Sequence, residues 1–155
     1  MVELPDNLRE RISQLRVDAS KKKVIASKHY LKCRTYQRKA TEISLDIQKH
    51  LDEINRLQHR KKYFESKAQE IERKFSGENN MDFAKKEIVQ RKRKATEIHA
   101  KIRACEMDIN EEKQKIEEYE KKAKECLKKS EDINKEAKEL EMEAVKLELR
   151  LVKKK

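Results

Sequence analysis

Apolar residues recur along this chain in alternating steps of three and four residues, first from Leu8 to Phe75 and again from Met81 to Leu151. These are the a and d positions of a heptad repeat, with Phe75 and Met81 both at a. Sixteen of the 20 positions in the first run are apolar, and 18 of the 21 in the second. This stripe, the seam, predicts an all-α coiled-coil protein with two long helices, at about residues 7–75 and 80–152.

The repeat is interrupted at residues 76–80, which read Ser-Gly-Glu-Asn-Asn and contain the only glycine of the chain. Glycine and asparagine tolerate the left-handed backbone that ends a helix, and Asn80 is a good N-cap for the next one. Phe75 and Met81 are six residues apart instead of seven, a shift that a continuous coiled coil does not absorb readily. The sequence therefore predicts one elongated unit, residues 1–155, made of arm 6–75, turn 76–80, arm 81–152 and basic tail 153–155.

The two arms are nearly equal in length, which favours an antiparallel hairpin over an extended parallel coiled-coil dimer. If Phe75 faces Ala84, attractive pairs are expected at Glu72–Lys85, Glu65–Lys92, Arg16–Glu141 and Arg9–Glu148. The same register gives repulsive pairs at Lys32–Lys129 and Lys39–Lys122. A parallel homodimer also makes mostly attractive pairs, and each exposed pair contributes only a few tenths of a kcal/mol. The charges therefore leave both topologies open, and the helix break favours the hairpin.

Seven seam positions are polar: Lys22, His29, His50, Lys61, Arg91, Glu112 and Ser130. Buried polar groups at a or d cost stability and can fix the register of a coiled coil. In the hairpin register His29 faces Ser130, and His50 lies one layer from Glu112. These four residues are the candidates for a register-setting role. The alternative is that the long side chains reach solvent and the histidines are simply accommodated.

The composition belongs to long helices and not to a globular core: 46% of residues are charged, and there is one Pro, one Gly and no Trp. The sequence contains no Gly-rich phosphate loop, nucleophile elbow or His-Glu-x-x-His helix, and its four histidines are scattered. We therefore expect no enzymatic activity, small-molecule substrate, cofactor or metal.

The three cysteines, Cys33, Cys105 and Cys126, lie on the seam at irregular spacing. This arrangement suggests neither a disulfide framework nor a zinc site, so we expect small core residues in a reducing compartment, the cytoplasm or the nucleus. No long apolar run or signal-peptide pattern is present, which predicts no membrane span.

The net charge of +11 comes mostly from the first arm: residues 1–75 hold 19 basic and 11 acidic residues. No acid occurs between Asp18 and Glu42. The basic residues in that interval are Lys21, Lys22, Lys23, Lys28, Lys32, Arg34, Arg38 and Lys39. A second group is Arg91, Lys92, Arg93 and Lys94, and a third spans residues 59–62. On a rod such charges attract polyanions, here nucleic acid or a microtubule; the alternative is an ordinary solvated helix face.

Apolar residues also occur outside the seam and would widen the apolar face toward a further helix, from an identical or a different chain. They are Val17, Val24, Ile25, Tyr30, Leu31, Leu45, Leu51, Leu127, Val145 and Leu149. The sequence thus predicts a structural or scaffolding coiled-coil subunit that docks partner helices in a larger multiprotein assembly of the cytoskeletal, centrosomal or chromosome-associated classes. The alternative is a basic rod that binds a polyanion through residues 21–39.

Overall fold

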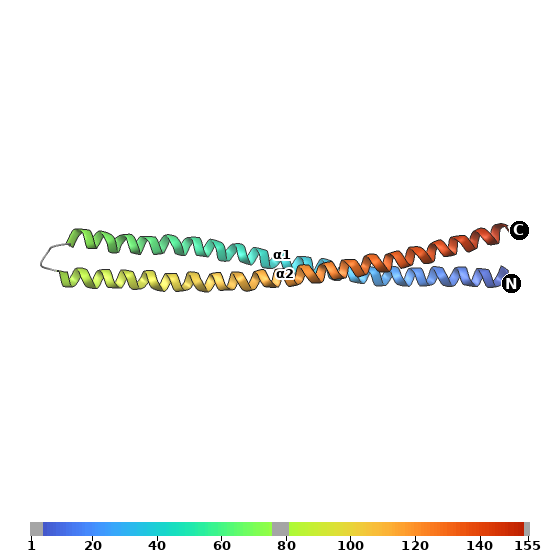
Figure 1. Cartoon of the computed structure of the whole chain (residues 1–155), viewed down its shortest axis with the longest axis horizontal. Helices are drawn as coiled ribbons and strands as arrows, with labels where there is room; N and C mark the ends of the chain where they lie inside the picture. Colours follow the sequence, from blue (N-terminus) through green and yellow to red (C-terminus); the bar gives the residue numbers. More distant parts are fainter. Residues whose placement is uncertain (1–4, 76–80, 154–155) are drawn as a thin grey trace. The chain divides into compact units, whose positions relative to one another are not determined.

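The computed structural model describes residues 5–75 and 81–153, apart from the side chains of Pro5 and Met81. Helix α1 runs over Pro5–Phe75 and helix α2 over Met81–Lys153. The two helices pack against each other in antiparallel directions (Figure 1). The predicted all-α hairpin is therefore confirmed, and the extended parallel arrangement is not the one adopted. The predicted turn 76–80, its cap Asn80, and residues 154–155 of the basic tail lie outside the described residues.

The helices are long because nothing in their sequences interrupts them. Apart from Pro5, which lies in the first turn of α1, neither helix contains a proline or a glycine, the two residues that break helices. The helix ends also carry charges that suit the helix dipole. Asp6 and Asp82 lie in the first turns, and Arg73, Lys74, Arg150 and Lys153 lie in the last turns.

The seam predicted from the sequence is the interface between the helices. Every described a and d position is buried or partly buried, and every buried residue among those described lies at a or d. The assignment of heptad positions is thus correct along both helices. The three cysteines follow it as free thiols, with Cys33 buried and Cys105 and Cys126 partly buried.

Residue contacts divide the hairpin into two units. Unit 1 contains α1 up to Ala40 and α2 from Glu118, and unit 2 contains α1 from Thr41 and α2 up to Glu117. The prediction that residues 1–155 form one elongated unit stays a prediction.

The core of unit 1 includes a cluster near the ends of the two helices. It is made of Leu8, Ile12, Ala144 and Leu147, with Leu15 and Leu151 packed against it. Between this cluster and Ala40 the buried residues are mostly alanines, including Ala137, which, like Ala144 of the cluster, has no exposed surface. Unit 1 is thus built mainly on small side chains.

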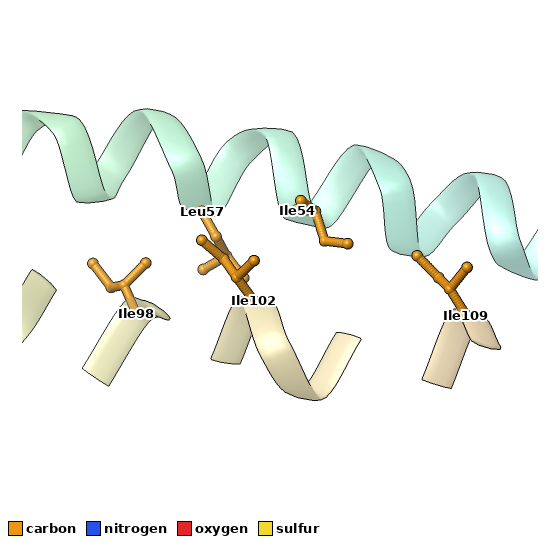
Figure 2. Close-up of a cluster of buried hydrophobic side chains, with 5 residues drawn as sticks. All are labelled: Ile54, Leu57, Ile98, Ile102 and Ile109. Atoms are coloured by element: carbon orange, nitrogen blue, oxygen red, sulfur yellow. The ribbon is translucent and has the colours of Figure 1, made fainter. Parts of the chain in front are cut away.

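The core of unit 2 is built on isoleucine. Ile54 and Leu57 of α1 meet Ile98, Ile102 and Ile109 of α2, and these side chains point toward one another across the interface (Figure 2). Ile47, Phe64 and Cys105 pack against this cluster. Most of the apolar burial in unit 2 therefore comes from large branched side chains.

The ion pairs that cross between the helices correct one part of the sequence prediction. Arg16 pairs with Glu148 instead of Glu141, and Glu141 pairs with Lys23. In unit 2, Glu72 pairs with Lys92 at 3.2 Å instead of with Lys85. The predicted partners were wrong by one heptad.

The direction in which helical side chains lean accounts for these pairs at heptad position e; the pair Arg11–Glu143, at position g, is offset in the opposite direction and is not explained by it. Each side chain tilts toward the N-terminus of its own helix. In an antiparallel pair, a residue of α1 therefore leans toward later residues of α2, and the α2 residue leans back toward it. Two side chains that are level along the helix axis in a simple register count therefore lean away from each other. The α1 side chain instead converges with the α2 residue that lies one heptad later in the sequence.

Candidate interaction surfaces

The acid-free interval of α1 does not form a uniform basic surface, because half of its eight basic residues have partners within unit 1. Lys22 pairs with Glu136 at 2.6 Å and Lys23 with Glu141. Arg34 donates a hydrogen bond of 3.1 Å to the Tyr30 hydroxyl and lies over its ring. Lys39 lies against the rings of two tyrosines. These four side chains are already used inside the hairpin.

The other four basic residues of the interval are Lys21, Lys28, Lys32 and Arg38. They are exposed, and they form no ion pair with any residue that the structure describes. Lys21 and Lys28 are both at heptad position c, and Lys32 lies one turn after Lys28. These three thus make a short basic row along one side of α1.

A tyrosine pair lies at the point where the sequence predicted repulsion between Lys39 and Lys122. The rings of Tyr36 and Tyr119 stack with their centroids 6.0 Å apart. Both ammonium groups lie 5.7–5.9 Å from the ring centroids. Each such contact contributes about 0.5–1 kcal/mol at an exposed site. The two rings therefore offset part of the repulsion between the lysines.

The second basic group does not form a single patch, because four consecutive helical residues point in four directions. Arg91 lies on the seam and pairs with Glu87 at 3.5 Å. Lys92 pairs with Glu72, and Lys94 lies 5.3 Å from the centre of the Phe64 ring. Arg93 is exposed. In the third group, Lys61 is directed to the partly buried His99, with 3.2 Å between its Nζ and Nδ1 of the ring.

Of the four candidates for a register-setting role, the structure brings two into contact. His50 Nε2 and Glu112 Oε1 are 3.0 Å apart and partly buried. The other carboxylate oxygen of Glu112 is buried without a hydrogen-bond partner among the described atoms. A buried oxygen without a hydrogen bond destabilises the folded state by about 1–3 kcal/mol. A register that separates the Glu112 carboxylate from His50 would therefore destabilise this layer.

The other two candidates are not joined. His29 is partly buried and Ser130 is buried on the seam of unit 1, but no hydrogen bond links them within the described part of the chain. Ser130 fits as a small side chain among the alanines. The register-setting role of all four residues stays a prediction, with direct contact available to His50 and Glu112 alone.

The exposed apolar residues of unit 1 have a regular spacing that the sequence prediction missed. On α1, Val17, Val24 and Leu31 are all at heptad position f, seven residues apart. On α2, Met142, Val145, Leu149 and Val152 alternate between f and b in steps of three, four and three. The signal was present in the sequence, but it was hidden among apolar residues at other positions, such as Ile25 at g and Tyr30 at e.

The described residues include neither a metal-binding cluster nor a membrane-spanning helix. No group of three or more His, Cys, Asp or Glu side chains within residues 5–75 and 81–153 is placed to hold a metal ion. Neither described helix contains a segment apolar enough, over a sufficient length, to cross a membrane.

A hydrogen bond to the Glu53 carboxylate raises the pKa of the Arg56 guanidinium. This is a local contact on the surface of α1.

Comparison with known proteins gives no relative: no family model, curated protein or solved structure matches this chain. The functional conclusion must therefore come from the surfaces themselves.

Proposed function

We propose that this chain is a non-enzymatic structural subunit, a coiled-coil hairpin that docks partner helices in a larger multiprotein assembly of the cytoplasm or nucleus. Cytoskeletal, centrosomal and chromosome-associated assemblies are the classes we favour. The observation that supports this proposal is the large apolar surface left after the seam is satisfied. The seam is closed by the chain's own second arm, yet fifteen large hydrophobic side chains remain exposed among the described residues. Some of them, such as Val17, Val24 and Leu31, recur at heptad spacing along one side of a helix, and exposed apolar residues gathered in this way mark a protein contact.

The proposal is tested by the state of the chain in the cells that express it. The chain, tagged in its own gene, is purified under native conditions, and its mass and cross-links are measured. We expect fixed stoichiometry with at least one other subunit and cross-links from residues of this chain to a helical segment of that subunit. Recovery as a free chain, without another subunit, contradicts the proposal.

A second candidate function is a rod that binds a polyanion, either nucleic acid or the microtubule surface, through residues 21–39. It is favoured by the four exposed basic residues of that interval that have no ion pair within the described part of the chain. Binding that releases counterions weakens as salt rises, so salt dependence is its signature.

Charge reversal tests this second function. We expect the variant Lys21→Glu, Lys28→Glu, Lys32→Glu, Arg38→Glu to lose salt-sensitive binding to duplex DNA, RNA or microtubules. The control is Lys86→Glu, Lys101→Glu, Lys113→Glu, Lys115→Glu, which changes the net charge equally at exposed positions of unit 2. Equal losses in the two variants would mean that net charge alone determines binding, and polyanion recognition by residues 21–39 would be rejected.

A further inference from the structure

A second heptad stripe runs along the outer side of α1 in unit 1. It consists of Ser13, Val17, Ser20, Val24, Ser27 and Leu31. These residues follow one another in steps of four, three, four, three and four, at positions b and f, and all six are exposed. A spacing of 3.5 residues is the pattern by which one helix receives another. We call these six residues the outer seam.

The side chains of the outer seam alternate in size, as the packing of one helix on another requires. Its b positions are all serine (Ser13, Ser20, Ser27) and its f positions are larger and apolar, so small and large side chains alternate along it. The f residues supply the apolar contact, and the small serines let a second helix approach closely, because the distance between packed helices depends on the side chains between them. The stripe extends over about 27 Å, at about 1.5 Å per residue from 13 to 31.

An open hollow of about 660 Å³ lies along the first half of the outer seam. Its lining includes four residues of the outer seam (Ser13, Val17, Ser20 and Val24), Leu151 of α2, and the charged residues Arg9, Arg16, Lys21 and Glu148. Side chains of a docked helix could enter this hollow as knobs enter holes.

The charges of α1 beside the outer seam are all positive, and the two acidic residues of α2 that lie there, Glu141 and Glu148, already pair with basic residues of α1. On one side, at c, lie Lys21 and Lys28, which have no ion pair with any described residue. On the other side, at e, lie Arg16 and Lys23, which already pair with Glu148 and Glu141 of α2. A helix that covers this stripe therefore meets two lysines without acidic partners.

This charge pattern argues against a second copy of the chain as the occupant. In a two-fold contact between outer seams, the flanking residues at c would meet the same residues of the other copy. Lys21 and Lys28 would then face lysines, and like charges beside a coiled-coil seam are destabilising. The acid-free interval from residue 19 to 41 offers no compensating carboxylate.

We infer that the outer seam docks an amphipathic helix of another protein whose apolar stripe is flanked by acidic residues, the carboxylates of which pair with Lys21 and Lys28. This inference rests on the proposed docking function and adds the surface and the chemistry of the partner.

The test uses the full chain and two synthetic peptides, each an amphipathic helix of about four heptads with leucine at a and d. One peptide carries Glu at every e and g position, and the other carries Lys. We expect the Glu peptide to bind in fluorescence anisotropy and the Lys peptide not to bind. Val24→Asp should weaken the Glu peptide at least about tenfold, because it places a carboxylate in the apolar contact.

Two matched variants complete the test. Val89→Asp changes a valine of unit 2 that is 56% exposed, the same fraction as Val24, and should leave binding unchanged. Lys21→Glu with Lys28→Glu should reverse the preference toward the Lys peptide. All the altered side chains are exposed, so helical circular dichroism should be retained in every variant.

Several outcomes would overturn the inference. These are equal binding of both peptides, binding of neither, or unchanged binding by Val24→Asp. A mass of two copies for the unliganded chain that Val24→Asp returns to one copy would assign the surface to self-association. Loss of peptide binding in the double lysine variant, together with unchanged binding in Val24→Asp, would assign it to a polyanion.

The failure of this inference can be told apart from the failure of the proposed function. If the chain is isolated from cells in a stable assembly whose cross-links avoid residues 13–31, the docking function stands and the outer seam is not the surface used. If the chain is isolated from cells as a free hairpin, the docking function itself fails, whatever the peptides do.

Discussion

Units 1 and 2 share one heptad spacing but place different side chains at position a. In unit 1, from residue 19 to 40 and from 123 to 144, every a position is small: Ala19, Ala26, Cys33, Ala40, Ala123, Ser130, Ala137 and Ala144. In unit 2 most a positions are isoleucine, including Ile47, Ile54, Ile102, Ile109 and Ile116. The distance between packed helices depends on the side chains at their contact, so small residues permit a closer approach.

Because their side chains at position a differ, the two units hold the same two helices together by different interactions. Isoleucine stabilises unit 2 by burial, at about 25 cal/mol per Å² of apolar surface. Alanine buries less, and unit 1 adds ion pairs that cross between the helices: Arg11–Glu143, Arg16–Glu148, Lys22–Glu136 and Lys23–Glu141. Unit 1 also leaves larger apolar residues on the outside, at the f positions of the outer seam. The unit with the smaller internal core is thus the one with a surface suited to another helix.

The largest expected effect comes from truncating the isoleucine core. Ile102→Ala should lower the free energy of unfolding by about 2–5 kcal/mol, because Ile102 is buried and a cavity would remain. Ile133→Ala makes the same change at a partly buried position of unit 1 and should cost clearly less. Urea unfolding followed by circular dichroism measures both. Equal losses would show that the two units do not differ in how much they depend on apolar burial.

The converse change enlarges the small seam of unit 1. Ala137 has no exposed surface, so Ala137→Leu should cost about 1–3 kcal/mol by forcing the helices apart. The control is Ala104→Leu in unit 2, which is exposed and should change stability by only a few tenths of a kcal/mol. A neutral or stabilising Ala137→Leu would mean that the alanine seam has room to spare, and the argument for close packing would fail.

The polar layer of unit 2 should have a smaller but measurable effect. A double-mutant cycle with His50→Ala and Glu112→Ala should give a coupling energy of about 1 kcal/mol, since the two side chains are partly buried and 3.0 Å apart. The same cycle on the exposed pair Glu72 and Lys92 of unit 2 is the control, with an expected coupling of a few tenths of a kcal/mol. A coupling near zero for His50 and Glu112 would reject their register-setting role.

The smallest effect is expected for a single ion pair of unit 1. A cycle with Arg16→Ala and Glu148→Ala should give a coupling of about 0.2–1 kcal/mol, because both side chains are about half exposed. About 1 M salt should remove most of this coupling through screening. A coupling that persists in high salt would mean that the contact is held by packing of the side-chain stems, and the contrast between the units would then lie in packing alone.

The fold could be predicted from the sequence because its main determinant is spacing. Forty-one seam positions in steps of three and four, with a break between Phe75 and Met81, are sufficient to define two helices and the face that each one buries. The charged residues could not decide between hairpin and parallel dimer, because exposed pairs contribute little energy in either arrangement.

The contacts around the seam were harder to predict because they depend on side-chain direction. Arg16 was assigned to Glu141 by register alone, whereas the tilt of both side chains brings it to Glu148. The Lys39–Lys122 repulsion was predicted without the stacked Tyr36 and Tyr119, which come from opposite arms and meet only in the folded hairpin. The basic interval was treated as one surface, although Lys22 and Lys23 are used internally.

The presence of two heptad stripes on one stretch of α1 also constrains how the length of this protein could change. A residue inserted between positions 13 and 31 rotates everything after it by about 100°, which misplaces the inner and the outer seam together. Only insertions of whole heptads restore both without a change of phase, and the antiparallel arm must then gain the same number of residues at the opposite point of α2. Changes of length in this segment should therefore come in paired whole heptads.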